Sequence, residues 1–549
     1  MKRTFIAATA ILAFAATAHA DELSDIQAQA KQMREQNAAM AKRLADIEKR
    51  QKTLEAQKNA VPTINPVDAM AADLPYKAAV KARPPENDDI CIKGICVYGD
   101  FDMGVAYQNH GSGFAAMAGG PLDYLISKNS AGSYFGAAAN MLSTSFIGLR
   151  GKQEIADNLY AVFNLQTLFN PASGQNANGP GSVALNSGLS TNTYFQNSFG
   201  DSSKGGQMFN NAAYFGVSSP TYGTFTMGRQ SALTSDLIVN YDPLSGSNAW
   251  SVITFQGANG GGGNTENRIL DNSYEYRVNV GPVRLAGEIQ ARSGGGLGTS
   301  TGNAFEGNIG VDYMGFSIDF VGGKIYDSVG IGSSALSQTL LTTCVNTFGA
   351  VMGCVPATVS DNTVFSVGAR YTIGPWKLFG GYEHISYANP ENPLNPGSIV
   401  QGTYIAPAPN NTNFINDKVL QTAWVGVRYA ITPALDITGA YYHEWQNSFG
   451  SAADAPVAGY GAVAGCSDAR STKCSGTLDA VSFVVDWRFA KHVDVFAGVM
   501  WSQVNNGLAS GFFQANGVSA AGVANGAANA GGGNHASSFD PGVGLRYQF

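Results

Sequence analysis

Charged residues are scarce in this chain of 549 residues, since Asp, Glu, Lys and Arg together make up only 13%. A typical globular chain carries about 25%. The formal net charge is −7, and an acidic balance argues against nucleic acid as a partner. Histidine is also rare, and the six histidines form no HExxH motif. We therefore expect no enzyme activity, no bound metal and no cofactor.

Long apolar runs are missing after the first twenty residues. No later segment approaches 18 consecutive apolar residues, which excludes a membrane-spanning helix. Residues 1–20, MKRTFIAATAILAFAATAHA, begin with two basic residues, continue as an apolar run and end in Ala-His-Ala. This pattern is typical of a secretory signal peptide, which is removed on export.

Cysteine is equally rare, but its six positions are informative because they fall in close pairs. In an exported protein, such spacing predicts three local disulfides. A metal site is a poorer interpretation, because no pair has CxxC spacing. The predicted pairs are Cys91 with Cys96, Cys344 with Cys354, and Cys466 with Cys474.

Residues 21–59 repeat with a period of seven, and residues 60–95 do not. A heptad repeat with an apolar d row predicts an α-helical coiled coil over residues 21–59. Residues 60–95 carry five prolines among alanines and polar residues, a composition that predicts a semi-extended linker. The d positions are Ile26, Met33, Met40, Ile47 and Leu54, and the a positions include the polar residues Asn37, Gln51 and Lys58.

Glycine is abundant, with 67 residues, and beyond Cys96 apolar and polar residues alternate with a period of two. This period predicts strands whose two faces meet different surroundings. A soluble sandwich also alternates, but nearly all of these strands have 8 to 13 residues, and short turns alternate with long loops. Both features are typical of outer-membrane barrels.

We therefore predict an all-β transmembrane fold over residues 96–549, a 16-stranded antiparallel up-and-down β-barrel. An even strand number places both ends of the barrel on the short-turn side, so the N-terminal α-helical coiled coil is expected in the periplasm. The predicted strands are 97–108, 143–154, 158–169, 212–219, 223–230, 268–279, 283–291, 304–313, 316–325, 363–372, 376–387, 418–430, 434–446, 477–489, 493–503 and 538–549.

The last predicted strand, PGVGLRYQF, places Val543, Leu545 and Tyr547 on one face and Arg546 on the other. We expect the apolar face to meet lipid and the Arg546 face to meet the channel. An open edge would leave backbone groups unpaired in lipid. This strand is therefore expected to pair with residues 97–108 and to close the barrel.

Five stretches resemble the general porins of Gram-negative outer membranes, and they follow the family's order. The resemblance implies a homotrimer of sixteen-stranded, water-filled channels that lie in outer-membrane lipid and lipopolysaccharide. It implies passive diffusion of ions and small hydrophilic solutes, and it makes Phe549 the C-terminal assembly signal. The stretches are VYGDFDMGVAY, SFIGLRGKQEIADNLYAVFNLQTLFNPASG, AAYFGVSSPTYGTFTMGRQ, NRILDNSYEYR and GVGLRYQF.

The resemblance also implies a constriction where the third long loop, residues 231–265, folds into the channel. Asp236 and Asp242 are the acidic residues of this loop. Opposite an acidic loop the family carries a basic wall, and opposed charges across a narrow passage create a transverse field that filters solutes.

Motif matching places Arg150, Arg229 and Arg268 in this basic wall. Strand parity sends Arg150 and Lys152 into water, whereas it sends Arg229 outward and lets Arg268 reach the channel only from the loop end or past a bulge. Phe146 and Asn211 stand where some members have further arginines. The sequence therefore leaves the preferred ion sign open.

An alternative function follows from the coiled coil, which is not part of the usual porin pattern. The segment is basic and could bind peptidoglycan or a periplasmic protein, with the barrel as its membrane anchor. A second interpretation is that the coiled coil supports the trimer. Deletion of residues 21–60 separates the two, because only the second predicts loss of trimers.

Overall fold

The fold is described from a computed structural model of the chain. The chain divides into two units, residues 1–65 and 66–549. In the first unit only Lys31, which is helical, is described. The predicted signal peptide, the rest of the coiled coil and residues 60–89 of the linker lie outside the described residues. In the second unit the structure describes residues 90–92, 94–109, 133–174, 176, 208–256, 260–261, 269–291, 303–331, 353–354, 357–392, 399–401, 404–406, 410–411, 414, 416–449, 475–506 and 535–549.

Sixteen long strands form a closed ring in which each strand is antiparallel to its neighbours. This arrangement confirms the predicted fold class and all sixteen predicted strands. The strands are β2 (Ile95–Gln108), β4 (Phe146–Ala156), β5 (Leu159–Leu168), β6 (Ala212–Ser219), β7 (Gly223–Ser231), β10 (Ile269–Val280), β11 (Val283–Gln290), β12 (Ala304–Tyr313), β13 (Phe316–Ile331), β15 (Ala357–Ile373), β16 (Trp376–Ala388), β20 (Lys418–Thr432), β21 (Leu435–Gln446), β22 (Gly476–Ala490), β23 (Val493–Asn506) and β24 (His535–Gln548).

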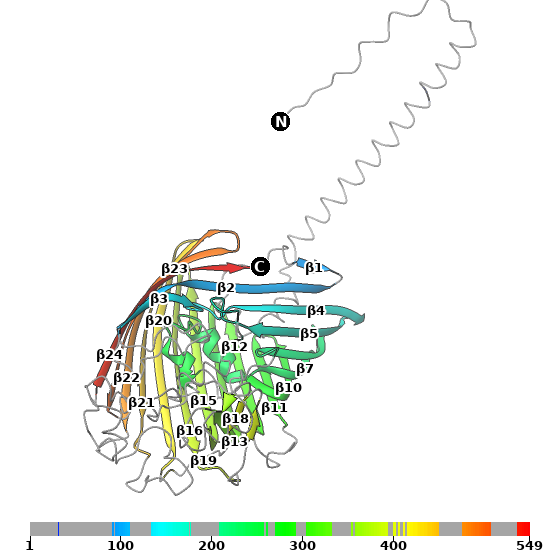
Figure 1. The fold of residues 1–549 in the computed structure, drawn as a ribbon. Coiled ribbons are helices and arrows are strands. Elements are labelled where there is room, and N and C mark those ends of the chain that lie inside the picture. Colours follow the sequence, from blue (N-terminus) through cyan, green and yellow to red (C-terminus); the bar gives the residue numbers. More distant parts are fainter. Residues whose placement is uncertain are drawn as a thin grey trace, which may run out of the picture. The chain divides into compact units, whose positions relative to one another are not determined.

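The ring closes between β24 and β2, as predicted, and Figure 1 shows the two strands side by side in red and blue. Their register runs from Asp100 opposite Gln548 to Ala106 opposite Gly542. The backbone of Phe549 continues the ladder, because it exchanges hydrogen bonds of 2.9 and 3.1 Å with Gly99. Along this stretch, closure gives the backbone groups of both strands their partners.

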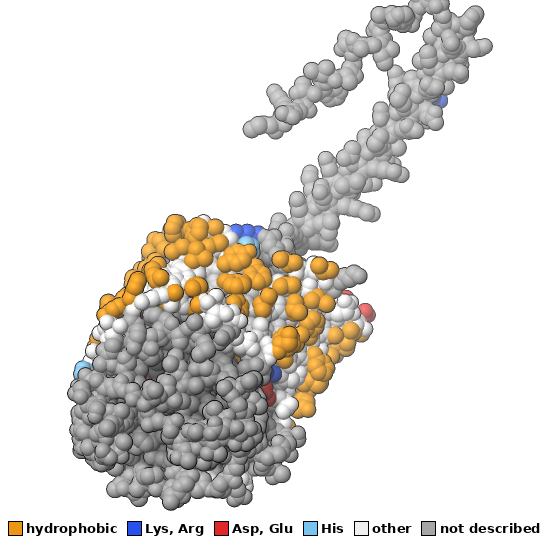
Figure 2. Space-filling view, viewed as in Figure 1, with side chains coloured by type: hydrophobic (Ala, Val, Ile, Leu, Met, Phe, Trp, Pro, Cys, Tyr) orange, Lys and Arg blue, Asp and Glu red, His pale blue; other side chains and the backbone are white. Residues whose placement is uncertain are grey.

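The two faces of the wall differ as the alternation predicts. Figure 2 shows apolar side chains gathered on the outer surface of the barrel. On β24, Val543, Leu545 and Tyr547 are exposed on this face, whereas Arg546 is 2% exposed on the inner face. An apolar outer band suits the hydrocarbon of a bilayer. Among the described residues, no helix is long and apolar enough to span a membrane.

Shorter elements were not predicted. The first of them, β1 (Ile90–Ile92), pairs with the start of β2, and a disulfide joins Cys91 to Cys96 between them. The first predicted disulfide is therefore confirmed; Cys344, Cys466 and Cys474 lie outside the described residues. The remaining elements are β3 (Tyr134–Ala139), α4 (Leu233–Tyr241), η3 (Val252–Thr254), β8 (Phe255–Gln256), β9 (Gly260–Gly261), β14 (Gly353–Cys354), β17 (Ile399–Gln401), β18 (Tyr404–Ala406) and β19 (Asn410–Asn411).

On one side β2 is paired with two successive strands, β3 and β4, and residues 140–145, called here the inserted segment, lie between them. β2 pairs with β3 along Met103–Gln108 and with β4 along Ile95–Asp100. Between β3 and β4 the inserted segment leaves the ladder and is held by Asp102. This carboxylate accepts hydrogen bonds from the backbone N–H groups of Met141, Leu142 and Ser143, at 3.1, 2.8 and 2.7 Å.

Candidate functional site: the inner loop and the channel wall

The candidate site is built by residues 232–256, called here the inner loop, which follow β7 and contain α4. Most of its described side chains are buried, and most of its buried hydrophobic residues belong to one core cluster with residues of the barrel wall. The hydrogen bonds described for this loop reach β10 to β13, β15, β20 to β22, β24 and the inserted segment. The inner loop therefore lines the inner wall from β10 round to β24.

Both ends of α4 meet a complementary charge on the wall. Ala232 stands at the N-cap and supplies no side-chain hydrogen bond. Glu306 of β12 takes that role, since its carboxylate accepts from the backbone N–H and the hydroxyl of Thr234, at 3.0 Å each. Just beyond the other end, Arg428 of β20 donates to the carbonyl of Pro243 at 2.6 Å. A negative group at a helix N-terminus and a positive group at its C-terminus both stabilise the helix dipole.

Tyr241 ends α4 with its hydroxyl fixed by the wall. This hydroxyl donates to Asp319 at 2.7 Å and accepts from Arg284 at 2.9 Å. The ring lies so close to Gly368 that a Cβ there would come within 2.6 Å of it. Glycine at that position of β15 therefore leaves the space that the loop occupies.

Trp250 anchors the far part of the inner loop. The side chain is completely buried, and its ring lies 5.9 Å from that of Phe496. The indole N–H donates to the carbonyl of Asp540 at 3.2 Å, and the backbone carbonyl accepts from Ser482 at 2.6 Å. A buried indole with its N–H satisfied is a strong anchor, because it combines a large apolar area with a fixed direction.

The inner loop is also bound to the inserted segment. Ala249 donates its N–H to the carbonyl of Met141 at 2.9 Å. The side chain of Asn248 donates to the carbonyl of Asn140 at 2.8 Å and to the hydroxyl of Thr144 at 3.0 Å. The loop is thus attached at α4, at Trp250 and at the inserted segment.

The two acidic residues predicted to line the passage lie against the wall. Asp236 forms an ion pair with Arg277 of β10. Asp242 is fully buried and accepts from the hydroxyl of Tyr442 and the N–H of Gly246, at 2.6 Å each. Burial raises the pKa of Asp242. These contacts are those of anchoring residues, and a role of the two carboxylates toward passing solutes stays a prediction.

Arg150 and Lys152 share the inner face of β4 with the buried Phe146, as strand parity predicts. The guanidinium of Arg150 lies 4.8 Å from the ring centre of Tyr98, and the ammonium of Lys152 lies 4.0 Å from that of Tyr160. Contact with an aromatic face holds a cation without neutralising it. Both side chains are partly exposed.

Arg229 and Arg268 have different outcomes. Parity predicts that Arg229 faces outward, and its register partner Ala213 lies on the face of β6 that carries the exposed Phe215 and Val217. Arg229 is nevertheless buried, because it binds Asp271 at 2.5 Å and the carbonyl of Asn210. Arg268 lies outside the described residues. A part in the constriction stays a prediction for both.

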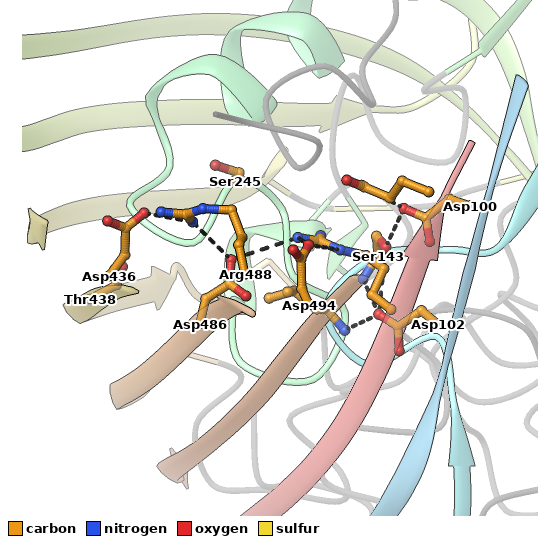
Figure 3. Close-up of polar contacts among 12 residues, drawn as sticks. Asp100, Asp102, Ser143, Ser245, Asp436, Thr438, Asp486, Arg488 and Asp494 are labelled. Atoms are coloured by element: carbon orange, nitrogen blue, oxygen red, sulfur yellow. Dashed lines mark hydrogen bonds and ion pairs between the residues drawn. The ribbon is translucent and has the colours of Figure 1, made fainter. Parts of the chain in front are cut away.

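Other inner-wall charges, which the sequence did not single out as a site, form a network (Figure 3). Arg488 binds Asp436 at 2.9 Å and Asp486 at 3.5 Å. Arg546 binds the same Asp486 at 3.7 Å and Asp494 at 2.7 Å. The network links β21 to β24. A signal was present, because strand parity places all of these side chains on the inner face.

A family model described as Gram-negative porin matches residues 7–507 of the chain. The chain belongs to this family. No significant match is found among curated proteins. The sequence resemblance to porins is therefore confirmed by the family model.

Solved structures that are similar to this porin include a loop-deletion mutant of OmpT, an outer membrane protein of Vibrio cholerae, with 12% identity and a TM-score of 0.47. The match covers 83% of this chain and 99% of that one. The outer membrane channel DcaP of Acinetobacter baumannii has 12% identity and a TM-score of 0.42, covering 84% and 99%. The Salmonella typhi OmpF complex with daunomycin has 12% identity and a TM-score of 0.38, covering 83% and 97%.

Membership of the family confirms the predicted location and activity. The porin lies in the outer membrane and forms a channel for passive diffusion. The alternative of an envelope tether finds no support in the comparisons. A periplasmic position of residues 21–59 stays a prediction.

Proposed function

We propose that solutes pass between the inner loop and the inner wall of β4, β5 and β6, and that Arg150 and Lys152 line that passage. The observation that carries the proposal is the one-sided attachment of the loop. Its described hydrogen bonds reach the wall from β10 to β24 and the inserted segment, and none of them reaches β4, β5 or β6. The side left uncovered carries the two partly exposed cations of β4.

The electrostatics of this passage follow from its two sides. On the loop side, Asp236 is ion-paired and Asp242 is buried, so little negative field reaches the solute. On the β4 side, Arg150 and Lys152 lie on aromatic rings and are partly exposed. Because charges act strongly across a narrow passage with low-dielectric walls, we infer a preference for anions over cations of similar size.

We further propose that the porin is a homotrimer surrounded by lipid and lipopolysaccharide, and that it catalyses no reaction. The apolar side chains exposed on the outer face support the contact with lipid. A passive channel needs a shaped and charged passage and no covalent step.

Conductance in a planar bilayer tests the proposal directly. Purified full-length protein should insert in steps of three equal conductance levels, and the reversal potential in a KCl gradient should have the sign of chloride selectivity. Steps of single size would contradict the trimer, and a reversal potential of the opposite sign would contradict the assignment of the passage to the Arg150 side. A silent membrane would contradict a channel altogether.

A further inference from the structure

Three cations lie together on the inner face of neighbouring strands. Lys377 of β16 stands directly opposite Arg428 of β20, and Arg370 of β15 is opposite Phe379, two residues further along β16. Side chains directly opposite have Cβ atoms about 5 Å apart, and diagonal neighbours are about 7 to 8 Å apart. Arg370, Lys377 and Arg428 are called here the cationic cluster.

The cationic cluster lacks the carboxylates that the other inner-wall arginines possess. Arg284, Arg488 and Arg546 each bind at least one Asp within 4 Å. Within the described part of the barrel, no ion pair reaches any member of the cationic cluster. Asp436 opposes the two arginines at Lys377, and Asp436, Asp486 and Asp242 act on Arg428 without forming a described ion pair with it. The three cations therefore have carboxylates in their surroundings, but none of these is described as bound to them.

The inner loop holds two members of the cluster in place, and no hydrogen bond is described between the loop and the third, Lys377. Arg428 donates to Thr438, to Ser245 and to the carbonyl of Pro243. Arg370 donates to the carbonyl of Asn240 at 3.4 Å. No nitrogen of the three side chains is among the buried, unbonded polar atoms of the described residues. The ammonium of Lys377, for which no hydrogen bond is described, is consequently not sealed from water.

The cluster lies near the turn end of the barrel. Lys377 is the second residue of β16, directly after the short turn from Ile373 to Trp376. Arg370 and Arg428 stand three and four residues before the ends of β15 (Ile373) and β20 (Thr432). Short turns face the periplasm in outer-membrane barrels. The cluster is thus between the underside of the inner loop and the periplasmic mouth.

We propose that the cationic cluster is a binding subsite for compact oxyanions with two negative charges, at the periplasmic mouth of the channel. Like charges held opposite one another on a sheet repel, so an anion between them removes a repulsion as well as making new contacts. A planar guanidinium donates in pairs to carboxylate or phosphate oxygens, and the flexible ammonium supplies a further donor. Chloride offers one centre and cannot contact all three cations.

The inference rests on the proposed channel, and inorganic phosphate is the probe that tests it. Chloride current through single channels is recorded at constant ionic strength while phosphate replaces chloride on one side and then on the other. Phosphate should block the current from one side at millimolar concentration. Lys377→Gln should weaken this block about tenfold, the scale of one charge-assisted hydrogen bond, whereas Lys377→Arg should keep it.

Lys491→Gln is the matched control, because Lys491 is exposed in the β22–β23 turn and its loss removes the same charge from the same end of the barrel. The phosphate block of this variant should stay within about twofold of that of the wild type. Equal block in wild type and Lys377→Gln, or an equal loss in both variants, would overturn the subsite. Conductance that persists without any block rejects the subsite alone, whereas an absence of conductance rejects the channel.

Discussion

The inner wall of this porin has two regions that use their charges differently. Behind the inner loop, from β10 to β24, charged groups such as Glu306, Arg488 and Arg546 are bound to the loop or to each other. On β4, Arg150 and Lys152 rest on tyrosine rings and stay partly exposed. Apart from the cationic cluster, the charged groups described in the first region hold the loop or one another, whereas the cations of β4 lie where solutes are proposed to pass. Net charge therefore says little about selectivity until the paired groups are set aside.

The largest effect is expected in the first region, when the buried side chain that anchors the inner loop is removed. Trp250→Ala removes a completely buried side chain together with its hydrogen bond to Asp540, and should cost about 3–5 kcal/mol in the free energy of unfolding. The freed loop should also make the open-channel current noisy. Urea unfolding in detergent and single-channel recording measure the two effects. Trp501→Ala is the control, since Trp501 faces outward on β23, and a noise increase equal to that of Trp250→Ala would contradict the anchor.

A smaller effect is expected at the N-terminus of α4. Glu306→Ala removes the only wall group described there as accepting from the Thr234 backbone, and loss of a helix cap costs about 1 kcal/mol. The same unfolding assay measures it. Glu391→Ala serves as the control, because its exposed ion pair with Lys324 should contribute little. If both variants unfold alike, Glu306 is not a cap.

The smallest effect on the free energy of unfolding is expected in the second region, on β4. The double variant Arg150→Gln, Lys152→Gln should leave stability nearly unchanged and lower the anion-to-cation permeability ratio about twofold, because exposed charges are screened. The reversal potential in a KCl gradient measures this ratio. An unchanged ratio would show that the passage lies elsewhere.

Strand parity predicted most of the fold, because a barrel wall has only two faces and a period of two identifies both. The sixteen strands, the β2–β24 seam and the inner faces of Arg150 and Arg546 follow from it. Parity does not give the burial of Arg229, which comes from its contacts with Asp271 and with the carbonyl of Asn210.

The candidate site was less predictable than the wall. Ala232 gives no sign of the helix that follows, because its cap comes from Glu306, 74 positions later in the chain. The inserted segment gives no periodic signal, because it is held by the Asp102 carboxylate and not by a ladder. The cap of α4 and the course of the inserted segment depend on contacts between residues that are distant in the sequence. The local sequence pattern therefore does not predict them.

The seam between β2 and β24 also has a kinetic consequence. Gln548 and Asp100, which bond across it at 3.2 Å, are separated by 448 positions. Contacts this distant in sequence form late and slow folding, because the whole intervening chain must first be arranged. Until then β2 and β24 both present unpaired edges, so closure of the seam is expected to be the slow step of barrel assembly.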